Sequence, residues 1–300
     1  MIEYHRTLLA DEVRTNAYRD AILRTVKPGD VVVDIGCGSG VLSFFACQAG
    51  AARVYAIDRG GMAGIAKFLS RNVGYADRIT VLRDESTGVE LPERADVLVT
   101  ETIGTLGLDE NMLGSIIDAR ARLLRENAAI VPSRLALSIV PVELPDRHEK
   151  HVLWWNERRY DLDLSPMRVF ASNSILFLSG DTDAHLAAPA IIIDVDLTTA
   201  LSTLVRGNAR FVASRDSVLH GFMLWFTATL VDGVTITSAD RGETHWSHGF
   251  FPLEEPIAMT RRAQIDVQLE TEDGKTWNWR GNAAKRAFDQ STLFGAAPFG

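Results

Sequence analysis

The clearest chemical pattern in the sequence is a glycine-rich turn between two carboxylates. An apolar run, Val31–Val33, ends in Asp34, and the turn just beyond it has glycine at every second position over residues 36–40. A second apolar run, Arg53–Ile57, ends in Asp58. Such glycines let a nucleoside approach the backbone, and the second acid can hold ribose hydroxyls. Dinucleotide-binding folds place the last glycine one residue later to seat a pyrophosphate. The tighter spacing, with Asp34 before it, favours S-adenosylmethionine over a dinucleotide, and the placement of strand, turn and acid disfavours a turn without a ligand.

A second set of candidate residues is acidic. Glu101 and Glu110 enclose a loop that contains Gly104 and Gly107, and such a loop can fold back so that both carboxylates point at one spot. Two neighbouring acids repel each other unless a cation lies between them. A guanidinium suits that place because its planar fork of donors matches carboxylates bidentately. The spacing is equally compatible with a loop in which Glu101 ends a strand at the surface, while Asp109 and Glu110 favour the N-terminus of the next helix.

A histidine lies next to a tryptophan in the C-terminal half, in the sequence Thr244-His245-Trp246. A single histidine in a loop is usually an ordinary surface residue. Beside an indole, it can instead line a slot that accepts a cation, with the tryptophan supplying a π face. Both interpretations of this loop are open from the residues alone.

Composition narrows the class of protein. A chain of 300 residues is long enough for two domains, and no apolar run reaches the roughly 18 residues needed to span a bilayer. The first residues lack the character of a signal peptide. Cys37 and Cys47 cannot form a disulfide framework, which predicts a reducing cytoplasm. A net charge of −8 argues against nucleic acid as the main partner and is compatible with a cationic substrate. We expect no membrane contact and no metal site.

Helices and strands must bring these residues together. We expect a helical region over residues 1–27, and then strands that alternate with helices. The expected strands are 31–35, 53–57, 79–82, 95–100 and 129–131, and the expected helices are 39–49, 62–72 and 111–124. This alternation predicts an α/β fold with a parallel sheet covered on both faces, which binds ligands beyond the carboxyl ends of its strands. Gly36, Asp58, Asp84 and Glu101 all fall there.

The remainder of the chain is rich in strands. The expected strands are 135–142, 191–197, 217–230, 264–270 and 276–279. Asp232-Gly233 and Asp273-Gly274 have the composition of hairpin turns. This half is therefore predicted to be an antiparallel barrel or sandwich.

These features divide the chain into two parts. We place a nucleoside-binding domain at residues 1–132 and a strand-rich domain at residues 133–300. At about residues 146–170, bulky apolar residues such as Trp154 and Trp155 alternate with charge in a segment too short for a core of its own. This segment is either a helical excursion over the strands or a docking arm for another subunit.

In combination, four stretches resemble the protein arginine methyltransferase family. They are residues 5–15 (its opening helix), 33–58 (its S-adenosylmethionine motif), 101–113 (its double-glutamate loop) and 244–256 (its Thr-His-Trp loop). The glycine turn alone is weak evidence, since many methyltransferases share it, whereas the last two loops together are highly specific. The resemblance covers most of the chain. It implies a Rossmann-like methyltransferase domain followed by an antiparallel β-barrel, with a helical dimerisation arm at about 146–170.

The resemblance also implies a reaction and a role for each site residue. The reaction is transfer of a methyl group from S-adenosylmethionine to a terminal guanidino nitrogen, by a cytoplasmic homodimer. The expected catalytic residues are Glu101, Glu110, His245 and Asp11, with His245 paired to Asp11. The expected substrate-binding residues are Trp246, Met112 and Leu8. The expected cofactor-binding residues are His5, Arg14, Asp34, Gly36, Gly38, Asp58, Asp84 and Glu85, with Arg14 pairing to the carboxylate of the cofactor.

The sequence departs from the family pattern in three places. It begins too late to contain an upstream helix that carries two tyrosines in the family. Thr102 and Thr105 replace bulky residues of the double-glutamate loop. Thr87 stands where an adenine-binding acid is expected, so Asp84 or Glu85 would have to serve. A reshaped substrate entrance with intact glutamates favours free L-arginine, or an arginine-derived metabolite of a biosynthetic pathway, over a protein arginine. We expect monomethylation.

Three alternatives stay open at this stage. The first is methylation of a protein arginine. The second is a small-molecule N- or O-methyltransferase whose acidic loop binds another amine. The third is a noncatalytic partner subunit that binds S-adenosylmethionine and regulates another enzyme, which the presence of both glutamates and His245 disfavours.

Overall fold

The computed structural model describes residues 2–178, 182–239, 244–272 and 274–292, so Asp273 of the second expected hairpin turn lies outside the described residues. The first half contains α1 (Ile2–Ala10), α2 (Glu12–Thr25), β1 (Val31–Ile35), α3 (Val41–Ala49), β2 (Arg53–Ile57), α4 (Met62–Asn72), β3 (Ile79–Leu82), β4 (Ala95–Thr100), α5 (Met112–Arg122) and β5 (Leu124–Val131). The second half contains β6 (Arg134–Val142), α6 (Pro145–His151), α7 (Arg168–Ser172), β7 (Leu176–Leu178), β8 (Ala190–Asp196), β9 (Leu204–Val212), β10 (Ser217–Val231), β11 (Val234–Thr237), β12 (His248–Met259), β13 (Gln264–Glu272), β14 (Thr276–Ala283) and β15 (Arg286–Ser291).

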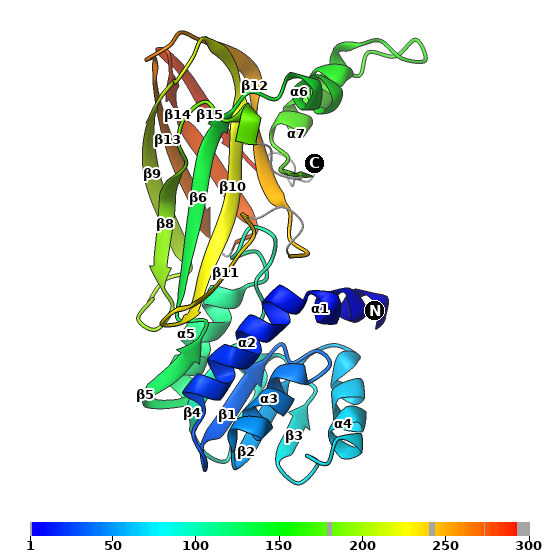
Figure 1. The fold of residues 1–300 in the computed structure, drawn as a ribbon. Coiled ribbons are helices and arrows are strands. Elements are labelled where there is room, and N and C mark those ends of the chain that lie inside the picture. The colour runs from blue at the N-terminus through cyan, green and yellow to red at the C-terminus, as the bar shows by residue number, and fades with distance from the viewer. Residues whose placement is uncertain (1, 179–181, 240–243, 273, 293–300) are drawn as a thin grey trace.

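The first half is built around a parallel sheet with the strand order β3-β2-β1-β4-β5 (Figure 1). Every residue of the central strand β1 is buried, as expected for a parallel strand covered on both faces. The predicted α/β architecture is confirmed. The carboxyl ends of β1, β2 and β4 meet at one edge of the sheet, which faces the second half in Figure 1.

The helical region expected at residues 1–27 is two helices rather than one. They meet at Asp11, whose side chain caps α2 by accepting a hydrogen bond of 3.0 Å from the backbone N–H of Arg14. An acid that satisfies a free N–H at a helix start favours a new helix over continuation of the old one. Both helices lie along the junction between the two halves (Figure 1).

The second half consists of two antiparallel sheets. One has the order β7-β12-β10-β6-β8, with β11 paired to β10, and the other has the order β15-β14-β13-β9. β8 packs beside β9, so the two sheets meet along that side. Their apolar faces enclose a core whose largest buried side chains include Phe222, Phe226, Trp277 and Trp279. This arrangement confirms the expected antiparallel barrel.

Two long strands of the barrel, β9 and β12, were absent from the sequence-based expectation. β9 alternates between exposed and inward positions, but two of the inward residues are Gly207 and Ala209, types that are depleted in strands, so its sequence gives only a weak strand signal. β12 contains Pro252 and Pro256, and proline argues against a central strand because it donates no ladder hydrogen bond. Pro252 is accommodated opposite Gly221, where the register between β10 and β12 shifts.

The segment at about 146–170 extends away from the barrel (Figure 1). It contains most of α6, two short 3₁₀ turns and the start of α7. Several large apolar side chains on it are exposed, among them Trp154, Tyr160 and Leu162. The residues between α6 and α7 therefore form a projecting arm, whereas α7 and His148 of α6 pack against β12. Among the helices that the structure describes, none is both long enough and apolar enough to cross a lipid bilayer.

Candidate functional site

A cavity of about 810 Å³ opens at the carboxyl ends of β1, β2 and β4. Its lining comes from α1, from Arg14 of α2, from the segments that follow the strands β1 to β4, and from His245 and Lys275 of the second half. A hollow of about 940 Å³ lies on the outer face of the four-stranded sheet, and none of the expected site residues lines it. The first cavity is therefore the candidate site.

The glycine turn after β1 lines this cavity without side chains in the way. Gly36 and Gly38 have φ angles of +73° and +52°, a backbone region that favours glycine. A Cβ atom on Gly38 would lie 2.8 Å from a ring carbon of His5, so His5 packs directly on the turn. Asp58 holds the turn from the other side, because its carboxylate accepts hydrogen bonds from the N–H groups of Gly38 at 3.0 Å and Gly60 at 2.7 Å.

Asp34 lies beneath the turn and does not line the cavity. It is buried, and its Oδ2 atom accepts a hydrogen bond of 2.6 Å from the hydroxyl of Ser43. Its Oδ1 atom has no hydrogen-bond partner among the described residues. Burial raises the pKa of Asp34 to about 7, against the effect of Ser43. We therefore correct the sequence-based expectation: Asp34 supports the turn instead of reaching a ligand directly.

The two acids after β3 line the cavity as expected. The carboxylate of Asp84 accepts a hydrogen bond of 2.8 Å from the backbone N–H of Glu85. Glu85 forms an exposed ion pair of 3.0 Å with Arg59, which also lines the cavity. Both acids are in reach of a ligand in this cavity, so the structure leaves the choice between them open.

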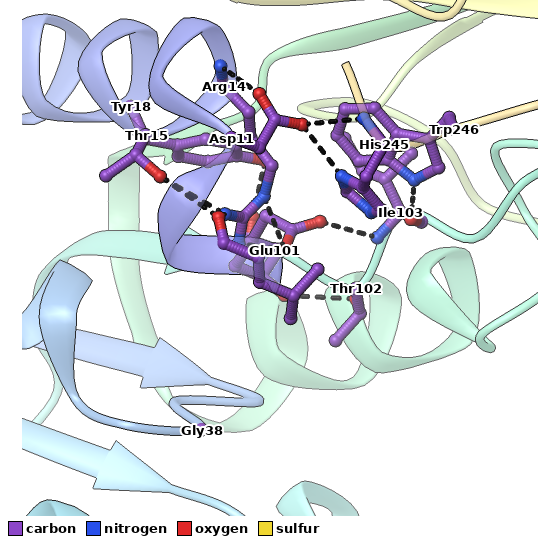
Figure 2. Close-up of polar contacts among 12 residues, drawn as sticks. Asp11, Arg14, Thr15, Tyr18, Gly38, Glu101, Thr102, Ile103, His245 and Trp246 are labelled. Carbon is purple, nitrogen blue, oxygen red and sulfur yellow. Dashed lines mark hydrogen bonds and ion pairs between the residues drawn. The ribbon is translucent and has the colours of Figure 1, made fainter. Parts of the chain in front are cut away.

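Glu101, at the end of β4, forms a buried ion pair with Arg14 of α2 (Figure 2). The Oε2 atom of Glu101 accepts hydrogen bonds from Nε of Arg14 at 3.0 Å and from Nη2 at 2.5 Å. Its Oε1 atom receives only a long contact of 3.4 Å from the N–H of Ile103. Burial raises the pKa of Glu101, and Arg14 opposes that shift. Arg14, the residue expected to bind the cofactor carboxylate, lines the cavity and is at the same time hydrogen-bonded to Glu101.

The second glutamate, Glu110, reaches the same cavity because the loop folds back. Asp109 stabilises this shape by accepting a hydrogen bond of 3.1 Å from the N–H of Leu106. Gly104 is needed here, because a Cβ atom on it would lie 2.1 Å from the Asp109 carboxylate. Glu110 is itself exposed at the cavity rim, where partial burial and Asp109 raise its pKa.

Neither Asp109 nor Glu110 caps the following helix, since the N-cap of α5 is Asn111. Of the two interpretations of this loop, the folded-back one is therefore correct. We call Glu101 and Glu110 the acid pair.

Asp11 and His245 join α2 to the barrel half (Figure 2). Asp11 accepts hydrogen bonds from the backbone N–H of His245 at 2.9 Å and from its Nδ1 atom at 2.8 Å, in addition to the cap to Arg14. Burial alone would raise the pKa of Asp11, and these hydrogen bonds hold it below its usual value. Burial lowers the pKa of His245, against the effect of Asp11. The expected contact between the two residues is present, and His245 lines the cavity.

Trp246 does not line the cavity, which corrects its expected role as a substrate-binding residue. It is buried, and its indole N–H donates a hydrogen bond of 3.0 Å to the carbonyl of Ile103 in the acidic loop. Its ring also packs edge-on against Phe226 of the barrel core. Trp246 thus fixes the loop that carries the acid pair.

The remaining expected substrate residues differ in their placement. Leu8 lines the cavity. Met112 is completely buried at the start of α5 and belongs to the hydrophobic core, so it does not reach the cavity. Two residues missed from the sequence, Tyr4 and Lys275, line the cavity. The helical spacing of Tyr4 and Leu8 could have indicated the first, whereas Lys275 comes from a hairpin that only the tertiary fold brings there.

The cavity combines two environments. The glycine turn and Asp58 offer a surface for a nucleoside, and the acid pair offers raised-pKa carboxylates that a cation would stabilise in the ionised form. Such a site can hold a nucleoside-based donor beside a cationic acceptor. Among the residues that the structure describes, there is no group of three or more side chains suited to a metal ion.

Comparison with known proteins gives a consistent result. Residues 134–283 match the family model of the arginine methyltransferase oligomerization subdomain, and residues 15–133 match that of the ribosomal protein L11 methyltransferase. The chain is 34% identical over 292 residues to protein arginine N-methyltransferase 6 of Xenopus laevis, covering 91% of this chain and 85% of that protein. It is 32% identical over 285 residues to the Danio rerio protein of the same name, covering 89% of this chain and 81% of that protein.

Solved structures agree on the fold. The chain superposes on PRMT1 in a Trypanosoma brucei enzyme–prozyme heterotetrameric complex with AdoHcy, with a TM-score of 0.86 and 22% identity over 97% of this chain and 98% of that one. It superposes on protein arginine methyltransferase 10 of Arabidopsis thaliana with a TM-score of 0.80 and 21% identity, over 97% of each chain.

Proposed function

This chain belongs to the protein arginine methyltransferase family, and from that premise we propose that it methylates arginine side chains of proteins. It is an S-adenosylmethionine-dependent arginine N-methyltransferase, and the protein acceptor is the part that we propose. The observation that carries the proposal is the convergence of the acid pair and the glycine turn in one cavity.

The residues around the glycine turn fit S-adenosylmethionine. Gly36 and Gly38 leave the cavity lining free of side chains, and the carboxylate of Asp58 has acceptor capacity beyond its two backbone N–H partners. When bound, S-adenosylmethionine supplies an electrophilic methyl group. Gly36, Gly38 and Asp58 would hold its nucleoside, and Asp84 or Glu85 its base.

The acid pair would hold the acceptor guanidinium. Arg14 occupies the Oε2 atom of Glu101 and fixes the orientation of that carboxylate, so its Oε1 atom remains for the substrate. Glu110 supplies the second carboxylate from the cavity rim. Together they draw positive charge to the outer nitrogens of the guanidinium and leave lone-pair density on the nitrogen that attacks. Holding both reactants in this geometry is the main contribution of the protein.

The proton released from the methylated nitrogen needs an acceptor. Glu110 is the better placed member of the acid pair, because Arg14 does not neutralise it and its exposed side chain can pass the proton to water. Partial burial and Asp109 raise the pKa of Glu110 toward the range useful for proton transfer. His245 would support the site through Asp11, at the start of the helix that carries Arg14.

A protein acceptor is better supported than free arginine. The relatives at 34% and 32% identity carry the name protein arginine N-methyltransferase, and nothing in the comparisons supports the free-arginine substrate favoured from the sequence. That expectation relied on the missing upstream helix and on small loop residues, which together would reshape the substrate entrance. Thr102, however, packs its methyl group against Gly36 and contacts the hydroxyl of Thr100 at 3.1 Å. Its small size thus serves the fit to the glycine turn.

We also propose that the protein forms a homodimer through the projecting arm, in a reducing cytoplasm. The matching family model describes residues 134–283 as an oligomerization subdomain, and Trp154, Tyr160 and Leu162 expose apolar surface on the arm. Light scattering at micromolar concentration should give twice the mass of one chain. A Leu162→Asp variant should weaken that association, and a monomeric wild type would contradict this part of the proposal.

The acceptor is tested with radiolabelled S-adenosylmethionine and three substrates. These are an arginine-rich peptide, the same peptide with lysine at each arginine, and free L-arginine. We expect label in the arginine peptide alone, and a single methyl group by mass spectrometry. Transfer to free arginine without transfer to the peptide would contradict the proposal.

A further inference from the structure

One face of α1 lines the cavity, and it carries an aromatic ring that the proposed reaction has not used. The cavity-lining residues of this helix are Tyr4, His5, Leu8 and Leu9, at positions i, i+1, i+4 and i+5. This spacing places all four on one side of a helix. None of the nine residues of α1 is buried, and Tyr4 is 57% exposed. A large ring left open on a cavity wall has room for a ligand to cover it.

The position of Tyr4 is fixed through the glycine turn. Its ring meets the ring of His5 edge-on, with centroids 5.8 Å apart and planes at 76°. His5 packs in turn on Gly38. The hydroxyl of Tyr4 makes no hydrogen bond within the described part of the chain, so no polar contact with the protein holds the ring away from a ligand.

Tyr4 lines the same cavity as Glu101 and Glu110 of the acid pair. Burial raises the pKa of the Tyr4 phenol, and Glu110 and Glu101 raise it further. The ring and the acid pair can therefore meet one ligand.

The chemistry of a guanidinium gives these groups separate tasks. Its N–H donors lie in the molecular plane, where carboxylates accept them, and its two faces carry no donors. An aromatic ring within about 6 Å of the cation stabilises one of those faces. The acid pair supplies the in-plane acceptors. Its carboxylates leave both faces of the guanidinium without a partner.

We propose that Tyr4 is a substrate-binding residue whose ring packs on the face of the guanidinium held by the acid pair. The inference rests on the proposed function, because it takes a guanidinium as the ligand. It adds a selection for planar, delocalised cations over a point charge such as an ammonium group.

The test compares Tyr4→Phe and Tyr4→Leu in the full chain. Phenylalanine keeps the ring, whereas leucine keeps apolar bulk and helix propensity but removes the π face. The matched control is Ile2→Ala, on the same helix, since Ile2 is 70% exposed and does not line the cavity. The probe is the arginine-rich peptide. Its binding in the presence of S-adenosylhomocysteine is measured by calorimetry, and its methylation by kcat and KM.

We expect Tyr4→Leu to weaken peptide binding and raise KM by about 5- to 10-fold, with kcat within about twofold of wild type. Tyr4→Phe should stay within about twofold, and Ile2→Ala should be unchanged. Binding of S-adenosylhomocysteine alone should be the same in all four proteins, which distinguishes loss of the ring from distortion of α1. Equal peptide affinity in Tyr4→Leu and wild type would overturn the proposal. So would a loss in Tyr4→Phe as large as that in Tyr4→Leu, because the hydroxyl and not the ring would then matter.

The binding experiment separates this inference from the proposed function. If wild type binds the peptide but transfers no methyl group, the proposed function fails, whereas weaker binding by Tyr4→Leu still supports the role of the ring. If wild type binds no arginine peptide at all, the role of Tyr4 is refuted as well.

Discussion

Replacing Glu101 by glutamine tests the core of the site, because the substitution keeps the shape of the side chain and removes its charge. In the wild type, two donors of Arg14 converge on the Oε2 atom, and the Oε1 atom is left for the substrate. A glutamine has only one acceptor oxygen to divide between these two sets of donors. If the amide oxygen faces Arg14, the amide nitrogen meets the N–H groups of the substrate. If the amide is flipped, the amide nitrogen meets the buried donors of Arg14.

Either orientation removes a charge-assisted hydrogen bond and leaves donors unpaired. A hydrogen bond to a charged group contributes about 1.5–3 kcal/mol. The amide N–H groups of glutamine, which then point at other N–H donors, add to the loss. We therefore expect Glu101→Gln to lose at least about 3 kcal/mol of transition-state stabilisation, which is roughly a 100-fold lower kcat/KM. The ion pair is nearly inaccessible, with side-chain exposures of 7% for Arg14 and 9% for Glu101. We expect a fall of about 3 kcal/mol in the free energy of unfolding, at the low end of the roughly 3–5 kcal/mol for a broken buried pair.

The assay measures kcat/KM with the arginine peptide, together with urea unfolding and S-adenosylhomocysteine binding. The matched control is Asp194→Asn, which removes the charge from a paired carboxylate on the outer barrel. Asp194 accepts two hydrogen bonds from Arg134, at 2.6 and 2.5 Å, but this pair is well exposed. The control should change stability by about 1 kcal/mol or less and leave kcat/KM within about twofold. A Glu101→Gln enzyme that keeps more than one tenth of wild-type kcat/KM would refute the assignment of Glu101 to the guanidinium.

Four further predictions follow from contacts and charges around the site. Asp11→Ala removes the cap of α2 and both bonds from His245, and should lower the free energy of unfolding by about 2–4 kcal/mol in urea titrations; a change below about 1 kcal/mol would contradict it. Gly274→Ala should reduce both activity and thermal stability, because a Cβ atom at this residue, whose φ is +74°, would lie 1.9 Å from the carbonyl oxygen of Leu108 in the acidic loop. A variant with the melting temperature of the wild type would argue against that contact. The raised pKa values of the acid pair predict that kcat/KM falls on acidification at a higher pH than free glutamate titrates, since the guanidinium needs both carboxylates ionised. The stability of the ligand-free protein depends on pH in the opposite direction to kcat/KM. A carboxyl group with a raised pKa contributes stability below its unfolded pKa and loses it as pH rises through the folded value, so Glu110→Gln should flatten the pH dependence of the melting temperature.

Much of the fold could be predicted from the sequence because it follows from local rules. β1 and β2 have the bounds expected from their apolar runs. The exposed strand β9 and the proline-containing strand β12 could not be predicted, because their pairing is stabilised by partners far away in the chain. In β9, glycine and alanine at two inward positions weaken the local signal for a strand.

For the site, the sequence by itself determined which chemical groups are present and on which strand ends they lie. The glycine turn, Asp58 and the acid pair follow from motifs confined to short segments. Tertiary structure alone decided which of these groups meet. Arg14 pairs with Glu101 across 87 residues of sequence, and Met112 is directed into the core. The physical reason is that a motif fixes backbone shape over a few residues, whereas the partner of a buried charge depends on which elements the completed fold packs around it.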